Sequence, residues 1–264
     1  MELKGAHVLV TGASRGIGEA MARRFAKAGA RVSVAARSLE PLRRLAGEIG
    51  GSAFGVDLLD PHEVDELIPR VESTAGSIDV LVNNAGLENS HWFRSEEPSV
   101  IRDVVRLNLE APLILTRAAL PGMLHRGRGA LVYTSSLAGT AGFPGLSVYS
   151  GTKAGLNNFV GALRLELRET PIGLTLVAPG PVDTRMWDTL EDEDDFAPML
   201  RRMNGLHLIP KKSPEMLARR TVRAVAKGRR HVRVPRRLSA MFWLGEAPRR
   251  LTEVVLTRVS LDRG

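Results

Sequence analysis

The sequence predicts an α/β fold, in which a doubly wound parallel sheet lies between two layers of helices as a three-layer α/β/α sandwich. Two observations indicate this. Short apolar runs alternate with segments of helical pattern along most of the chain. The apolar runs do not alternate with polar residues, which is typical of strands that are buried on both faces of a parallel sheet.

The elements follow from this pattern. Strands are expected over residues 6–10, 31–36, 52–56, 78–82, 130–134, 174–178 and 231–234. Helices are expected over 19–28, 41–49, 61–75, 99–120 and 213–227, with a further helix beginning near Tyr149. Ser213 is a suitable N-cap for the last helix and Pro214 suits its first position.

Composition limits the possible classes of protein. With 264 residues, 44% of them hydrophobic, the chain can bury the core of one large domain, expected over residues 1–235. The absence of cysteine excludes disulfides and thiolate sites. The start of the chain does not resemble a secretory signal and no apolar run is long enough to span a membrane, so a cytoplasmic location is expected. No metal site is predicted, because the six histidines show no metal-ligand spacing. They are His7, His62, His91, His125, His207 and His231.

The charge is unevenly placed. Residues 1–200 hold 20 Lys and Arg against 25 Asp and Glu, whereas residues 201–264 hold 17 against 4. Residues 236–264 form a basic amphipathic tail that could lie on an anionic membrane, pack across a subunit interface, or close over the lid described below. Nucleic acid is the less favoured partner, because the tail shows no recognised module. Residues 184–212 are expected to form a lid.

A glycine-rich turn follows the first strand. Gly12, Gly16 and Gly18 stand between that strand and a helix, where the backbone can approach a pyrophosphate and the helical amides point at it. An ordinary turn remains the alternative. The second strand closes with Ala36, where NAD-binding proteins carry an acid, and Arg37 follows it. Together with Arg15 in the turn, Arg37 favours NADP(H), unless both arginines are simply solvated.

Tyr149 and Lys153 lie one helical turn apart, on one face of the expected helix. A cation beside a phenol is expected to lower the pKa of the tyrosine. A tyrosine poised in this way could act as a general acid and base on a carbonyl or an alcohol. Chance pairing on a solvated helix is the alternative.

With these pieces, the chain resembles the short-chain dehydrogenase/reductase family over about residues 4–190. The matching motifs occur in the family's order and spacing: Thr11-Gly12-x-x-x-Gly16-x-Gly18, Asp57, Asn83-Asn84-Ala85-Gly86, Asn108, Ser136, Tyr149-x-x-x-Lys153 and Pro179-Gly180. The resemblance implies a Rossmann-like fold.

The resemblance also implies roles for particular residues. Tyr149 would be the general acid and base, Lys153 would support it, and Ser136 would bind the substrate oxygen. Asn108 would hold a water that connects Lys153 to solvent. The implied cofactor-binding residues are Gly12, Ser14, Arg15, Gly16, Ile17, Gly18, Arg37, Asp57, Leu58, Asn84, Ala85, Gly86, Tyr149, Lys153, Pro179, Gly180, Val182 and Thr184.

The expected function is therefore an NADP(H)-dependent oxidoreductase that interconverts a carbonyl and an alcohol on a lipophilic substrate. The alternative is an NADPH-binding scaffold or sensor without turnover. Substrate contacts are expected from Leu87, Trp92, Phe143, Leu146, Met186 and Trp187, with packing of Met186 and Trp187 into the core as the alternative. The tail differs from the family's usual end, which puts the usual tetramer in doubt, and a homodimer through the helices of Asn108 and Tyr149 is expected.

Overall fold

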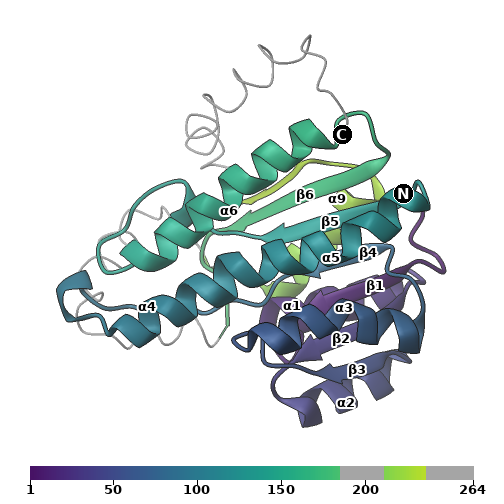
Figure 1. Cartoon of the computed structure of the whole chain (residues 1–264), viewed down its shortest axis with the longest axis horizontal. Helices are drawn as coiled ribbons and strands as arrows, with labels where there is room; N and C mark the ends of the chain where they lie inside the picture. The colour runs from purple at the N-terminus through teal and green to yellow at the C-terminus, as the bar shows by residue number, and fades with distance from the viewer. Residues whose placement is uncertain (185–210, 236–264) are drawn as a thin grey trace.

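A computed structural model of the chain describes residues 1–184 and 211–235. Within these residues, one parallel sheet of seven strands lies between two layers of helices (Figure 1). The strand order is β3-β2-β1-β4-β5-β6-β7, which confirms the predicted fold class. The strands are β1 His7–Thr11, β2 Arg31–Ala36, β3 Ser52–Gly55, β4 Val80–Asn83, β5 Gly129–Thr134, β6 Ile172–Pro179 and β7 His231–Val234.

The order of the strands places the functional edge of the sheet. Strands β2 and β3 are added in turn on one side of β1, and β4 then pairs with β1 on its other side. In open parallel sheets, ligands bind at this reversal, beyond the carboxyl ends of the strands. The central strands β1, β4 and β5 are buried along their whole length, so no polar group of theirs reaches solvent except at those ends.

Each face of the sheet is covered by one helical layer. On one face, α1 Gly16–Lys27, α2 Leu39–Ile49 and α9 Pro214–Ala226 share a core with the valines of the central strands. On the other face, α3 Pro61–Ala75, α5 Ala111–His125 and α6 Ser147–Glu166 share a core with the leucines of the same strands. Ser213 caps α9 by accepting a hydrogen bond from the backbone N–H of Met216 (3.2 Å), as predicted.

The helix predicted over residues 99–120 is interrupted. It consists of α4 Pro98–Val105, a π-helical segment Arg106–Glu110 and then α5. Pro112 explains the interruption, because it has no N–H to donate to the carbonyl of Asn108 four residues earlier and its ring crowds that carbonyl. Single-turn π segments of this kind are frequent at functional sites.

Several predictions from the sequence fall on residues that the structure does not describe. Almost all of the lid (184–212), with Met186 and Trp187, and the basic tail (236–264) lie outside the described residues. The division into a domain and a tail therefore stays a prediction. Within the described part of the chain, no helix has the length and apolar character required to cross a membrane.

Candidate functional site

A hydrogen-bond network joins the carboxyl ends of the two central strands. The Thr11 hydroxyl on β1 donates to the carbonyl of Val82 on β4 (3.2 Å). It accepts from the backbone N–H groups of Asn84 (3.0 Å) and Ala85 (3.1 Å). The Asn84 side chain returns a bond to the Thr11 carbonyl (3.0 Å). The turn after β4 is therefore held against the turn after β1.

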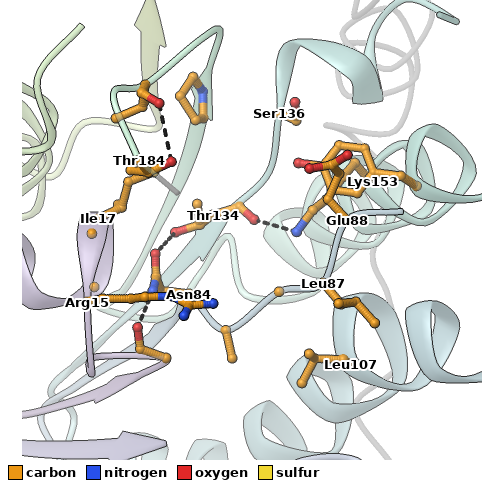
Figure 2. Close-up of a pocket in the computed structure, with 18 of the residues that line it drawn as sticks. Arg15, Ile17, Asn84, Leu87, Glu88, Leu107, Thr134, Ser136, Lys153 and Thr184 are labelled. Atoms are coloured by element: carbon orange, nitrogen blue, oxygen red, sulfur yellow. Dashed lines mark hydrogen bonds between the residues drawn. The ribbon is translucent and has the colours of Figure 1, made fainter. Parts of the chain in front are cut away.

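The network continues to the next strand and to α6. The Thr134 hydroxyl at the end of β5 donates to the side-chain oxygen of Asn84 (3.2 Å), and Lys153 Nζ on α6 donates to the Thr134 carbonyl (3.1 Å) (Figure 2). Thr134 thus connects the turn after β4 with the lysine of the predicted catalytic pair.

The glycine-rich turn fits a dinucleotide. Gly12 has a positive φ of 64°, and a Cβ there would lie 2.7 Å from the Cα of Ala85. A Cβ on Gly18 would lie 2.2 Å from the Gly12 carbonyl oxygen, so only glycine allows α1 to approach β1 this closely. Arg15, the N-cap of α1, makes no side-chain capping bond. The first amides of α1 are therefore open to an anion such as a pyrophosphate.

One cavity of about 750 Å³ runs along these strand ends. It brings together every residue predicted to bind the cofactor, from the glycine turn through Arg37 and Asp57 to Pro179, Gly180, Val182 and Thr184. Ser136, Tyr149 and Lys153 line the same cavity. Among the predicted site residues, Asn108 does not line it.

Asn108 lies behind the cavity wall and is fully buried. Its side-chain oxygen accepts from the backbone N–H of Leu87 (2.9 Å), and its Nδ2 donates to the Leu87 carbonyl (2.7 Å). A Cβ on Gly86 would lie 3.2 Å from Asn108 Oδ1 and 3.5 Å from Lys153 Nζ, so only a glycine separates the two side chains. In this structure Asn108 fixes the segment after β4, and its role toward a water stays a prediction.

The prediction that Lys153 lowers the pKa of Tyr149 is wrong for this structure. Burial raises the pKa of Tyr149 to about 12. Ser136 lowers this pKa without outweighing burial, and the charge of Glu88 raises it further. Lys153 Nζ lies 5.6 Å from the centre of the Tyr149 ring and donates to Thr134 rather than to the phenol. Lys153 is not among the groups that shift the pKa of Tyr149, and the loss of solvation on burial is the largest effect.

Lys153 is affected by burial in the opposite sense. Its side chain is 4% exposed, and burial lowers its pKa to about 8. A lysine with this pKa is mostly protonated at neutral pH, and loses its charge as the pH rises through about 8.

The two serines after β5 have different partners. Ser136 accepts from the backbone N–H of Ala138 (3.1 Å), and its hydroxyl lowers the pKa of Tyr149. Ser135 instead bonds the side chain of Asn157 (2.5 Å), whose Nδ2 donates to the Gly139 carbonyl (3.0 Å). Asn157 therefore fixes the turn that carries Ser136. Asn157 was not predicted from the sequence, although it stands one helical turn after Lys153.

The wall of the cavity near Tyr149 combines apolar side chains with one acid. Leu87, Phe143 and Leu146 line it as expected, and Leu107 lines it too. The expectation for Trp92 is wrong, since this residue does not line the cavity and is 43% exposed before a short 3-10 turn. Glu88, which was not predicted, does line it.

A spectroscopic titration tests the pKa of Tyr149. The chain has only two tyrosines, and burial raises the pKa of Tyr133 as well as that of Tyr149. A raised pKa keeps a phenol protonated, so the folded protein should develop no tyrosinate absorbance as the pH passes 10, whereas the urea-unfolded chain should titrate at about 10. A native tyrosine that ionises below pH 10 and disappears in Tyr149→Phe, but not in Tyr133→Phe, would contradict this result.

Comparison with known proteins shows which family this chain is similar to. The family model described as short chain dehydrogenase matches residues 6–195. A ketoacyl reductase, HetN, from Nostoc sp. is 38% identical over 70% of this chain and 68% of its own length. The bovine 3-oxoacyl-[acyl-carrier-protein] reductase is 36% identical over 70% of this chain and 78% of its own length.

The solved structures agree. A single-residue variant of an actinorhodin polyketide ketoreductase, solved with NADPH, superposes with a TM-score of 0.79 at 30% identity, and the match covers 87% of this chain and 95% of that protein. The strand order, the glycine turn and the ordered motifs fit the same grouping. The chain is an oxidoreductase that belongs to the short-chain dehydrogenase/reductase family.

Proposed function

We propose that the protein is an NADP(H)-dependent oxidoreductase that interconverts a carbonyl and an alcohol on a lipophilic substrate, with Tyr149 as general acid and base. One observation carries the proposal. Ser136 and Tyr149 line the same cavity as the two arginines and the uncapped N-terminus of α1. A single elongated ligand site thus combines proton transfer with anion binding.

Side chains of the protein would supply and accept the proton that is transferred to or from the substrate oxygen. Ser136 and Tyr149 would both hydrogen-bond the substrate oxygen, and in reduction Tyr149 would donate its hydroxyl proton as negative charge develops there. In oxidation the same oxygen would take the proton back. The nicotinamide, when bound, supplies or accepts the hydride. A pKa raised to about 12 keeps Tyr149 in its proton-donating form at neutral pH, which suits carbonyl reduction.

Lys153 would act beside this pair as a fixed cation. Its ammonium is buried and held by the Thr134 carbonyl, which places it at the end of β5. From there it would support the ribose of the nicotinamide and the charge on Tyr149, as the family resemblance implies. The hydrogen-bond network from Thr11 through Asn84 and Thr134 to Lys153 would hold the turns after β1, β4 and β5 in fixed positions relative to α6.

The preference for NADP(H) is supported by Arg15 and Arg37. Both line the cavity, at the turn after β1 and just beyond β2, and β2 ends at Ala36 rather than at an acid. Arginine binds a phosphate with paired donors, whereas a carboxylate would bind the ribose hydroxyl of NAD.

The lipophilic substrate is supported by four apolar side chains that line the same cavity as Ser136 and Tyr149, namely Leu87, Leu107, Phe143 and Leu146. The ketoacyl reductases among the relatives act on carbonyl groups of acyl chains, as their names state, which agrees with an apolar wall.

Turnover of ketones tests the role of Tyr149. With NADPH and a panel of lipophilic ketones, Tyr149→Phe should lower kcat by about 10²- to 10⁴-fold, because it removes the proposed proton donor to the substrate oxygen. Tyr133→Phe makes the same chemical change outside the cavity and should retain activity. Equal turnover by wild type and Tyr149→Phe would rule out the proposed acid. NADPH binding without any turnover would favour the scaffold or sensor.

Exchange of one arginine tests the cofactor. Arg37→Asp should weaken NADPH binding by about ten- to a hundredfold, since a charge-assisted contact becomes a repulsion, while NADH binding should improve or stay the same. Arg43→Asp makes the same change on the exposed face of α2 and should leave both affinities unaltered. An unchanged ratio of NADPH to NADH affinity in Arg37→Asp would place the phosphate elsewhere.

We also propose a homodimer through α4, α5 and α6. The support is two exposed apolar residues, Val105 on α4 and Ile114 on α5, each 38% exposed. In sedimentation measurements, Ile114→Glu should shift the protein toward the monomer, because a carboxylate would be buried between the subunits. Phe93→Glu, at a residue that is 63% exposed outside these helices, should leave the mass unchanged. A wild-type monomer would overturn the proposal.

A further inference from the structure

Ser135 joins the end of β5 to two other elements. Its backbone N–H donates to the carbonyl of Val177 on β6 (2.7 Å). Its hydroxyl donates to the side-chain oxygen of Asn157 on α6 (2.5 Å) and lies 3.4 Å from the Lys153 carbonyl oxygen. Ser135 and Asn157 are 2% and 4% exposed, so these bonds are shielded from water. The residue immediately before Ser136 is therefore fixed through both its backbone and its side chain.

Asn157 also holds the turn that follows Ser136. Its Nδ2 donates to the carbonyl of Gly139 (3.0 Å), the last residue of the short 3-10 turn η3 Leu137–Gly139. A Cβ on Gly139 would lie 2.8 Å from Asn157 Nδ2 and 2.8 Å from the Lys153 carbonyl oxygen, so only glycine lets this turn pack so closely against α6. Asn157 is therefore bonded to the chain on both sides of Ser136.

The turn η3 in turn orients the Ser136 side chain. The hydroxyl oxygen of Ser136 accepts from the N–H of Ala138 (3.1 Å), and the Ser136 carbonyl accepts from the N–H of Gly139 (3.1 Å). Because the Ala138 N–H occupies a lone pair of the hydroxyl oxygen, the hydroxyl keeps its proton for a ligand in the cavity that Ser136 lines. A shift of η3 would move that proton.

Tyr149, the other group proposed to hold the substrate oxygen, stands on the same helix as Asn157. Tyr149, Lys153 and Asn157 follow at intervals of four residues on α6, so their side chains lie along one stripe of the helix. The unbroken helix Ser147–Glu166 is a rigid link between them. Asn157 is not among the described residues that line the cavity, so any effect of it on the reaction passes through the groups that it holds.

We infer that Asn157 is a positioning residue, which sets the distance between the Ser136 hydroxyl and Tyr149. It does so through its bonds to Ser135 and Gly139. The inference rests on the proposed function, in which Ser136 and Tyr149 share the substrate oxygen. Both groups must then be at hydrogen-bond distance from one atom, and a misplacement of about 1 Å can lower the rate about a hundredfold. Asn157 thus acts on the transition state and not on the binding of the cofactor.

Replacement of Asn157 by leucine, a side chain of similar size, removes both bonds. With NADPH and a lipophilic ketone, Asn157→Leu should lower kcat by about ten- to a hundredfold, because the Ser136 hydroxyl leaves its position. KM for the ketone should change by less than about threefold, since a loss of this kind is expected for an interaction made only in the transition state. Kd for NADPH should stay at the wild-type value, because Asn157 lies outside the described cavity wall.

A double-mutant cycle separates this role from a general loss of structure. Ser136→Ala removes the hydroxyl that Asn157 positions, so the addition of Asn157→Leu should then lower kcat by no more than about a further twofold. Thr175→Val is the matched control. Thr175 is also 4% exposed, and its hydroxyl donates to the Arg229 carbonyl (2.9 Å), away from the residues that line the cavity. It should leave kcat close to the starting value in both backgrounds.

Three results would each overturn the inference and leave the proposed function standing. They are a wild-type kcat in Asn157→Leu, an equal fractional loss of kcat with and without the Ser136 hydroxyl, and weaker NADPH binding that parallels the loss of kcat. Should thermal unfolding show that Asn157→Leu does not fold, Ser135→Ala removes one of the two bonds and should lower kcat by about threefold or more, again only while Ser136 is present. A wild type that reduces no ketone would refute both proposals.

Discussion

The site depends on one hydroxyl, that of Thr11, which serves three backbone groups of a neighbouring strand and its turn. It donates to Val82 and accepts from Asn84 and Ala85, at the point where β1 and β4 end side by side. Parallel strands leave their last carbonyl and amide groups without ladder partners. Here those groups are joined by side chains, so the two turns that flank the cofactor crevice form one rigid unit. Thr134 and Lys153 extend that unit across β5 to α6.

Burial has opposite effects on the two members of the Tyr149 and Lys153 pair. It raises the pKa of the phenol and lowers that of the ammonium, because in each case it disfavours the charged form. Lys153 donates one of its three ammonium protons to the Thr134 carbonyl, which leaves two for a bound ligand or for the phenol. In the proposed mechanism, the strength of Tyr149 as an acid therefore depends on the bound ligands as well as on the protein.

Much of the fold could be predicted from the sequence, for local reasons. Strands buried on both faces read as unbroken apolar runs, and the bounds of β2, α3 and β7 agree with expectation. The glycine turn and the residues after each strand were brought into one cavity because the carboxyl ends of parallel strands share an edge. The π segment was not predicted, although Pro112 was a visible cause, since helical periodicity continues through it.

Other features depend on distant contacts and have no local signal. The raised pKa of Tyr149 follows from desolvation, which spacing along a helix does not report. Trp92 was expected in the cavity from its place in the chain, but side-chain direction in an irregular segment follows from packing. Glu88 reads in the sequence as an ordinary acid in a loop, because the bonds from Asn108 that fix the backbone before it come from a distant helix.

The two hydrogen bonds from Asn108 to Leu87 divide the chain after β4 into a part whose backbone is fixed and a part that can vary in sequence. These bonds end at Leu87, so the chain is fixed up to the last residue that supports the proton-transfer groups. The stretch from residue 88 to α4 begins only after that clamp. Apart from Glu88, whose charge raises the pKa of Tyr149, the length and chemistry of this stretch can change without moving the backbone that Asn108 fixes, so that one frame could be adapted to a succession of different substrates.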